Sequence, residues 1–202
     1  MKLSIVQYGE PVLRAKGARV GKIDHRVREL AQDMIETMHE AHGIGLAAQQ
    51  VGEPLQLTVL DVSQVEDRPS TMKLNGENVD PKTVTPIVLI NPKITLGTQT
   101  ELGLEGCLSF PEITGDIERS ISATVCAEDL DGNKIEIEAT GLLARAIQHE
   151  VDHLNGILFI DRMSSAAKAA LSSKLKRLQK QTKRGQRLRA KDLEQVVTET
   201  TL

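Results

Sequence analysis

The pentapeptide His-Glu-Val-Asp-His at residues 149–153 constrains this chain more than any other segment. Residues four apart lie one above the other on an α-helix, so both imidazoles can reach one divalent metal ion. The intervening Glu150 can then act as a base on water bound to that ion. The flanking residues are largely apolar, which predicts a buried helix over residues 142–155. Two buried histidines without partners would cost several kcal/mol, so a metal site is favoured over two solvent-facing histidines.

Length and composition are those of an ordinary globular protein. The 202 residues are 40% hydrophobic and 26% charged, which fits one domain with an appendage. The longest purely apolar runs, such as residues 157–160, are far shorter than the roughly 20 residues that span a bilayer, so a membrane partner is not expected. The first residues lack the apolar stretch of a secretory signal, and a cytoplasmic location is expected. Two cysteines are too few for a disulfide scaffold.

The hydrophobic pattern predicts a first helix, then several strands. Residues 24–42 carry one apolar stripe at helical spacing, with Asp24 as the N-cap and Gly43 as the C-terminal stop. Alternating or apolar stretches predict strands over residues 55–62, 84–90, 94–102, 120–128 and 134–139. The last two of these should pair as a hairpin around Asp131 and Gly132.

The order of these elements predicts an α+β fold. Strands followed by a buried helix are typical of that class. We expect antiparallel β-sheets packed around a central helix that carries residues 149–153, with a C-terminal helix from about Ser165. That last helix should dissolve in the basic residues 183–187. The polar residues 63–82 are expected to form a long surface loop.

Charge is distributed unevenly along the chain. Residues 163–191 hold ten Lys or Arg and no Asp or Glu, which leaves 15 basic and 28 acidic residues elsewhere, a net charge of −13. This segregation suggests an acidic body with a basic tail. Since the predicted metal site lies in the body, we expect a catalytic domain over residues 1–163 and a basic helix and tail over residues 164–202. The acidic body argues against general nucleic-acid binding, and three aromatic residues are too few for base-stacking platforms.

Two histidines leave the predicted metal site incomplete. After His153 the chain offers Asp161, but no Glu or His at the usual helical spacing. Upstream, Cys107 follows Gly106, which permits close backbone approach, so its thiolate could face the metal helix. Cys126 lies in a regular predicted strand and is interpreted as a core residue. Cys107 is therefore the candidate third ligand, with a plain core residue as the alternative.

Three segments together resemble the signature motifs of the peptide deformylase family. They are Gly-Ile-Gly-Leu-Ala-Ala-Gln-Gln at residues 43–50, Glu-Gly-Cys-Leu-Ser at residues 105–109, and Gln-His-Glu-Val-Asp-His-Leu-Asn-Gly at residues 148–156. All three are intact and in the family's order, and the resemblance extends from residues 11–14 to about residue 163. It implies removal of the N-formyl group from the initiator N-formylmethionine of newly synthesised proteins, with release of formate.

The resemblance also implies a role for each matching residue. One metal ion per chain, Fe²⁺ with Zn²⁺, Ni²⁺ or Co²⁺ as possible substitutes, would be held by Cys107, His149 and His153. Glu150 would be the general base and later the acid. The Gln50 side chain and the Leu108 backbone N–H would hold the oxyanion. From the residues themselves, Asp152 is interpreted as an acid that supports the ligands, paired with Arg119, with simple solvation as the alternative.

The substrate pocket can be partly inferred from helical spacing. Leu142, Ala146 and His149 share one helix face, so a methionine side chain could lie against it, with Ile44 opposite. The alternative is that these residues only pack the core. Gly45 would let a peptide backbone run alongside as an added strand.

Two other classes of protein stay open. A peptidase with the same metal and base would cleave internal peptide bonds, but the missing downstream ligand and Cys107 count against it. A non-catalytic metal-binding or RNA-binding module would need a fourth Cys or His at suitable spacing, which we do not find. Amine release from formyl-Met-Ala-Ser, compared with casein cleavage, separates these classes. The basic tail could bind the phosphate-rich ribosome surface or be a plain solubilising appendage.

Overall fold

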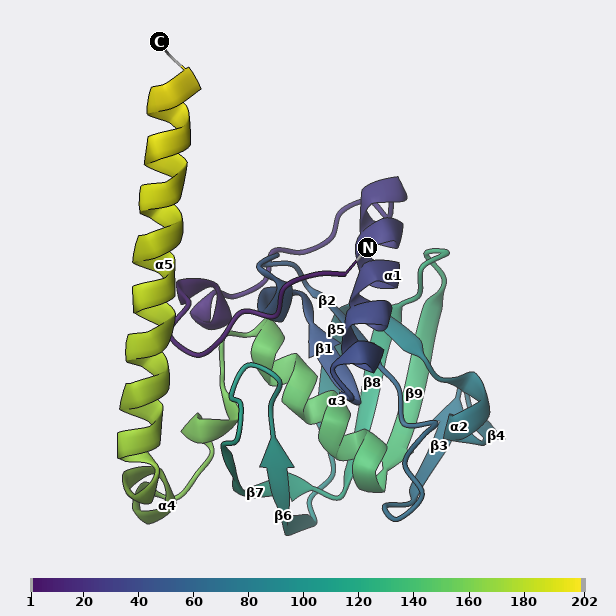
Figure 1. Cartoon of the computed structure of the whole chain (residues 1–202). Helices are drawn as coiled ribbons and strands as arrows, with labels where there is room; N and C mark the ends of the chain where they lie inside the picture. Colours follow the sequence, from purple (N-terminus) through teal and green to yellow (C-terminus); the bar gives the residue numbers. More distant parts are fainter. Residues whose placement is uncertain (1, 201–202) are drawn as a thin grey trace.

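A seven-stranded sheet and a two-stranded hairpin enclose a buried helix in the computed structural model, which describes residues 2–200 (Figure 1). All neighbouring strands pair antiparallel. The large sheet has the order β1 (Gly45–Ala47), β2 (Leu57–Leu60), β5 (Ile87–Leu96), β8 (Ser122–Glu128), β9 (Lys134–Thr140), β3 (Ser70–Leu74), β4 (Glu77–Val79). The hairpin consists of β6 (Thr100–Gly106) and β7 (Thr114–Ser120). The predicted α+β class, with antiparallel sheets around a central helix, is confirmed.

One helix lies between the sheet and the hairpin, and the others pack around them. The helices are α1 (His25–Glu40), α2 (Pro81–Val84), α3 (Gly141–Leu154), α4 (Ser165–Ala170) and α5 (Ser172–Thr200), with short 3-10 turns η1 (Pro11–Arg14), η2 (Ala48–Val51) and η3 (Phe159–Asp161). The central helix α3 contacts strands of the large sheet on one side and β7 of the hairpin on the other. None of the helices within residues 2–200 combines the length and apolar character needed to cross a bilayer.

Helix α1 begins and ends through local hydrogen bonds. The Asp24 side chain accepts a bond from the Val27 N–H, as predicted for an N-cap. At the other end, the Gly43 N–H donates to the Met38 carbonyl at 2.9 Å. The left-handed residue after the helix is His42, with φ 53°, and not the predicted stop Gly43. Together with the bond from the His42 N–H to the His39 carbonyl, this is a Schellman motif, and the helix ends one residue earlier than predicted.

Helix α3 is buried over nearly its whole length. All its residues from Leu142 to Leu154 are buried, which the predicted helix over residues 142–155 anticipated. Its start requires a glycine, because Gly141 has φ 64° and a Cβ there would meet the Pro69 carbonyl oxygen at 2.2 Å. The same oxygen accepts a bond from the Leu142 N–H. The residue directly before β3 therefore holds the first turn of α3 in place.

Two sequence predictions in the middle of the chain are wrong. Residues 63–82 are not one surface loop, because β3, β4 and the start of α2 lie within them. Met72 is buried in the core, but its neighbours in the sequence are polar. The polar composition of these short strands therefore predicted a loop. The strands predicted over 84–90 and 94–102 are also misplaced. A single strand, β5, covers residues 87–96 and contains a bulge at Asn91, which has φ 54°.

The C-terminal helix packs against the body and then projects beyond it (Figure 1). Leu175 and Leu178 are buried in a cluster with Leu13, Phe110 and Phe159. Helix α5 does not dissolve at residues 183–187, as predicted, but continues to Thr200. Lys, Arg and Gln are good helix formers, and one glycine costs only about 1 kcal/mol. The side chains of residues 189–200 lie outside the described part.

Asp161 connects three segments below α3. Its carboxylate pairs with Arg14 of η1 and Lys168 of α4, and accepts the Leu158 N–H. Burial alone would raise the pKa of Asp161, but the hydrogen bonds from Arg14, the Leu158 N–H and Lys168, with the charge of Arg14, together outweigh burial and lower the pKa to about 2. A lowered carboxyl pKa means that the ionised form stabilises the folded state.

We expect Asp161→Asn to lower the free energy of unfolding at pH 7 by about 1 kcal/mol. The difference from wild type should persist down to about pH 4, the unfolded pKa of Asp, and shrink as pH falls towards the folded value. Thermal melts of both proteins between pH 7 and pH 3 measure it. Asp131→Asn, which removes an exposed pair with Arg28, is the control with little effect. A difference that does not change below pH 4 would contradict this role.

Candidate active site

Three potential metal ligands converge beside α3. One ligand atom from each of Cys107, His149 and His153 lies within 4.8 Å of the others. The Cys107 Sγ is 3.3 Å from His153 Nε2, and both histidines are buried. Burial, followed by the nearby His149, lowers the pKa of His153 well below its usual value. A neutral imidazole keeps its nitrogen lone pair for a metal, so this donor set fits a divalent ion with a further position open.

Glu105 lies directly behind His149. Its Oε2 is 3.0 Å from His149 Nδ1, which leaves His149 Nε2 for the ligand cluster. Burial lowers the pKa of His149, but hydrogen bonds to Cys107 and Glu105 outweigh it and raise the pKa well above the usual value. Sequence reasoning placed Glu105 in a motif but missed this contact, because it joins β6 to α3 across the molecule.

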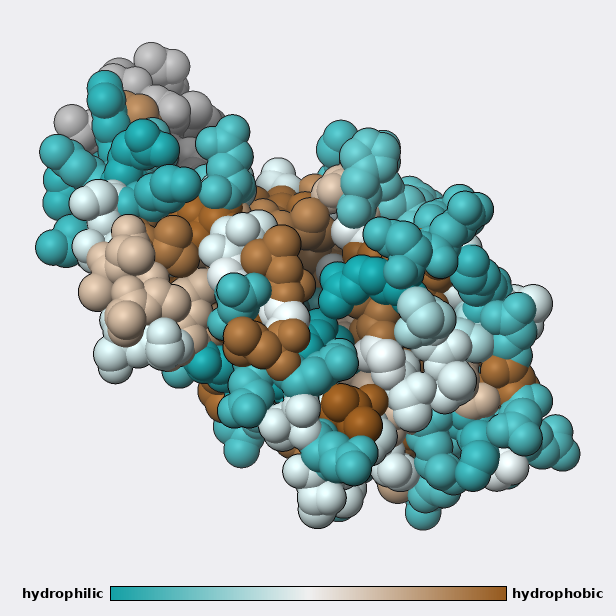
Figure 2. All heavy atoms as spheres, turned by 90° about the horizontal axis from the view of Figure 1, so that it is seen from below, coloured by the Kyte–Doolittle hydropathy of each residue, from teal (hydrophilic) through white to brown (hydrophobic). Residues whose placement is uncertain are grey.

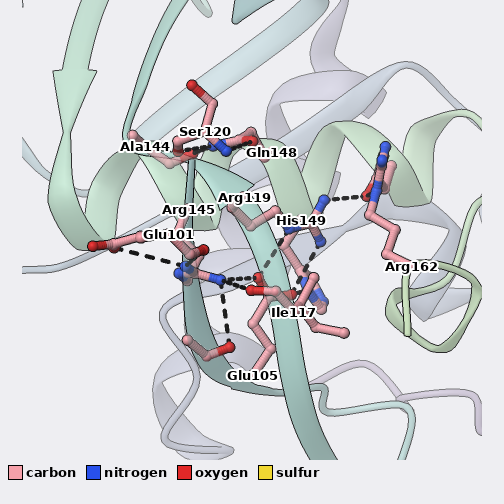
Figure 3. Close-up of polar contacts among 12 residues, drawn as sticks. Glu101, Glu105, Ile117, Arg119, Ser120, Ala144, Arg145, Gln148, His149 and Arg162 are labelled. Atoms are coloured by element: carbon pink, nitrogen blue, oxygen red, sulfur yellow. Dashed lines mark hydrogen bonds and ion pairs between the residues drawn. The ribbon is translucent and has the colours of Figure 1, made fainter. Parts of the chain in front are cut away.

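Two buried arginines hold the Glu105 carboxylate (Figure 3). Arg119 donates to both of its oxygens at 2.9 and 3.0 Å, and Arg145 donates to Oε1 at 3.0 Å. Burial would raise the pKa of Glu105, but hydrogen bonds with His149 and Arg119 lower it to about 2. The carboxylate is therefore ionised at neutral pH and fixes the orientation of the His149 ring.

Asp152 continues this network on the same helix. It accepts bonds from Arg119 and, through both oxygens, from Arg162. The predicted pairing of Asp152 with Arg119 is present. Asp152 therefore acts on the ligands indirectly, since it holds the arginine that holds Glu105. Removing one member of such a buried network leaves a charge unpaired, which costs about 3–5 kcal/mol.

The Gln50 side chain is oriented by its own backbone. Its Oε1 accepts the Ala47 N–H at 2.8 Å, so the Nε2 end must point the other way. Nε2 lies 3.5 Å from Cys107 Sγ and 3.3 Å from Ser109 Oγ. These long contacts place an amide donor beside the ligand cluster. Ser109, which sequence reasoning did not single out, is buried and helps to fix it.

The Glu150 carboxylate packs against the backbone of β1. A Cβ on Gly45 would lie 2.3 Å from Glu150 Oε1, so only glycine leaves room for this side chain. The other oxygen, Oε2, is buried without a hydrogen-bond partner, which suits a contact with water or substrate. Burial raises the pKa of Glu150 to about 7, against an opposing effect of His149. Such a carboxyl can take up and release a proton near neutrality.

A cavity of about 530 Å³ opens beside these groups. Its lining includes Cys107, Leu108, Gln50, His149 and Glu150, and the predicted substrate contacts Ile44, Gly45 and Ala146. Leu142 does not line it but packs in the apolar core under the sheet. Helical spacing placed Leu142 on the right face, but the first turn of α3 is covered by the chain around Pro69 and Ser70.

One cysteine differs from its sequence interpretation, and one histidine outside the site is paired. Cys126 is exposed on β8 and its thiol donates to Glu136, so its assignment to the core is wrong. Its neighbours Val125 and Ala127 face the core, and the two-residue period of a strand turns Cys126 to solvent. His39 is exposed on α1 and pairs with Asp61 at 2.7 Å. Neither belongs to the ligand cluster.

Comparison with known proteins identifies the family. The chain matches the polypeptide deformylase family model over residues 2–169. It is 46% identical over 190 residues to a peptide deformylase of Opitutus terrae, covering 93% of this chain and 98% of the relative. The corresponding enzyme of Dictyoglomus thermophilum is 46% identical over 158 residues, with 78% and 90% covered.

Comparison with solved structures leads to the same family. The peptide deformylase of Thermotoga maritima superposes with a TM-score of 0.69 at 39% identity, covering 81% of this chain and 99% of that one. That of Synechococcus elongatus, in complex with actinonin, gives 0.73 at 41% identity, with 85% and 87% covered. With the fold and the Cys/His/His cluster described above, these matches show that the chain belongs to the polypeptide deformylase family, whose members are metal-dependent hydrolases that remove the N-formyl group from the initiator methionine of new proteins.

Proposed function

We propose that Cys107, His149 and His153 hold the metal of this deformylase and that Glu150 moves the protons of its reaction. The observation that carries the proposal is the convergence of three ligand atoms within 4.8 Å beside a buried, unpartnered Glu150 oxygen. Among metals, we propose Fe²⁺, with Zn²⁺, Ni²⁺ or Co²⁺ as substitutes, since a thiolate with two imidazoles suits all four.

Each residue then has a defined task in formamide hydrolysis. A metal ion bound there supplies Lewis acidity and a water molecule of lowered pKa. Glu150 Oε2 takes a proton from the attacking water and later gives it to the departing amine nitrogen, so that formate and a free amino group result. Glu105 keeps the His149 ring in one tautomer throughout.

Charge builds on the formyl oxygen as water adds. The Gln50 Nε2 group is held beside Cys107 by the anchored Oε1, so it can donate to that oxygen. The Leu108 N–H, next to the Cys107 ligand, is the second proposed donor. One such preorganised donor is worth about 3 kcal/mol of transition-state stabilisation. An amide donates without competing as a metal ligand.

The substrate would bind along the free edge of β1. This strand is terminal in the sheet, with β2 as its partner, so the backbone around Ile44 and Gly45 can pair with an extended peptide. The methionine side chain would lie in the cavity between Ile44 and Ala146. The proposed substrate is an N-formylmethionyl nascent peptide, which places the enzyme in the cytoplasm near ribosomes.

We also propose that residues 164–202 are an appendage to a catalytic part formed by residues 1–163, and that the appendage binds the ribosome surface. Leu175, Leu178 and Thr182 face the body, so the basic side chains of α5 point to solvent. Seven of them are exposed within residues 172–188, which contain no Asp or Glu: Lys174, Lys176, Arg177, Lys180, Lys183, Arg184 and Arg187. Such a face can neutralise phosphates without sequence readout.

Gly45→Ala tests the contact between β1 and Glu150. The added Cβ displaces the carboxylate, because it would lie 2.3 Å from Glu150 Oε1, at the flexible end of that side chain. We expect kcat/KM for formyl-Met-Ala-Ser to fall about 100-fold, with bound metal unchanged. Gly21→Ala, where a Cβ would meet nothing within 4 Å, is the matched control. Full activity of Gly45→Ala would show that the position of Glu150 does not matter.

Glu150→Gln tests the proton-transfer role. The variant should keep near-stoichiometric metal and lose several orders of magnitude in kcat, because the amide cannot accept the proton. Amine release from formyl-Met-Ala-Ser and metal content are measured on the same sample, with casein cleavage expected from neither protein. Loss of metal together with activity would argue that Glu150 is a ligand instead.

Cys107→Ala tests the ligand set against a cysteine control. The variant should lose or weaken metal binding, whereas Cys126→Ala, at the exposed β8 position, should retain it. Oxidation of a thiolate ligand should also inactivate wild type on peroxide treatment, with loss of metal. A Cys107→Ala protein with full metal and full activity would overturn the assignment.

Reversal of charge on α5 tests ribosome binding better than truncation does, because truncation would remove Leu175 and Leu178 from the core. We expect Lys176→Glu, Lys180→Glu and Arg184→Glu together to reduce co-sedimentation with ribosomes, while activity on formyl-Met-Ala-Ser stays within a few-fold. Wild-type binding should fall steeply as salt rises. The control keeps the charge: Lys176→Arg, Lys180→Arg and Arg184→Lys together. Equal binding of both variants at low salt would leave α5 as a packing appendage.

A further inference from the structure

The outer face of the β6–β7 hairpin carries the two most exposed large hydrophobic side chains among the described residues. Leu102 is 69% exposed and Leu104 is 58% exposed. They occupy alternate positions of β6, so their neighbours Gly103 and Glu105 face inward towards Arg145. Figure 2 views this end of the molecule and shows hydrophobic side chains beside hydrophilic ones around a hollow.

Acidic residues stand directly across from these leucines. In the pairing register, Glu118 of β7 lies opposite Leu102 and Asp116 lies opposite Leu104, and both acids are exposed. Side chains of opposed residues in an antiparallel pair lie on the same face. The only basic residue in the two strands is Arg119, which is buried in the Glu105 network. This face therefore combines apolar surface with negative charge.

The same face is continuous with the active-site cavity. Leu104 of β6 and Thr114 of β7 line the cavity, and so does Glu112. The substrate is the start of a long chain, so the residues after the formylmethionine must leave the cavity. An extended peptide advances about 3.3–3.6 Å per residue, as does the strand itself. A chain that follows β6 from Cys107 would thus pass Leu102 after about five residues.

We propose that this hairpin face, formed by Leu102, Leu104, Asp116 and Glu118, binds the nascent peptide from about its fourth residue onward and favours apolar and basic side chains there. The apolar side chains lie on the two leucines, and Lys or Arg side chains pair with the two acids. The inference rests on the proposed substrate path and adds to it a determinant of specificity outside the cavity.

The test compares two formyl heptapeptides that share formyl-Met-Ala-Ser and then continue as Leu-Lys-Leu-Lys or as Ser-Glu-Ser-Glu. We expect wild type to show about tenfold higher kcat/KM for the first, mainly through KM. Leu102→Ser should reduce the ratio about threefold, and Asp116→Lys should abolish it. Both variants should process formyl-Met-Ala-Ser at the wild-type rate, since neither residue lines the cavity.

Matched controls carry the same changes elsewhere. Leu188→Ser on α5 and Glu77→Lys on β4, both exposed positions, should leave the ratio unchanged. Equal kcat/KM for the two heptapeptides in wild type would overturn the inference, as would variants that keep the ratio or lose tripeptide activity. A dimer in sedimentation that Leu102→Ser dissociates would assign the face to a second copy instead. Failure of wild type on the tripeptide would contradict the proposed function and not this inference alone.

Discussion

The ionised carboxylate of Glu105 is the contact on which the site depends. It joins β6 to β7 through Arg119 and to α3 through Arg145 and His149. Cys107 lies two residues further along the chain, directly after β6, so the strand that carries Glu105 also positions the proposed thiolate ligand. A buried carboxylate between two arginines tolerates little displacement, because any unpaired charge in this environment is costly. The hairpin and the helix therefore behave as one rigid support for the proposed ligands.

The sequence contained enough to predict the class of fold and much of the site. Helix α3 was predictable because its apolar residues recur at helical spacing and its histidines are four apart. The hairpin of β8 and β9 was predictable from alternation around a turn. The roles of Gln50 and Leu108 came from the resemblance to a family, since a glutamine and a backbone N–H in a loop carry no chemical signal of their own.

What escaped prediction depends on tertiary contacts. The contact between Glu105 and His149 spans 44 residues and requires the register of the hairpin against α3. Helical spacing identified the face that Leu142 shares with His149, but not that the chain near Pro69 covers its first turn. An Asn-Pro pair is typical of a turn, so the sequence predicted that one strand ends before residue 91 and another begins after it. In the structure Asn91 adopts a left-handed conformation within the single strand β5. Cys126 was misassigned although strand alternation with Val125 would have turned it outward.

The cluster that supports Cys107 from behind is assembled from both ends of the chain. Val6 and Leu13 come from the start, whereas Leu175 and Leu178 of α5 come from near the end, and all four pack in the cluster that contains Phe110. During synthesis the early segments leave the ribosome long before α5 does, and contacts this distant in sequence form late. The proposed metal site is thus supported only after α5 has been synthesised. A newly made copy therefore depends on an older molecule of the enzyme to deformylate its own first residue while it is being synthesised.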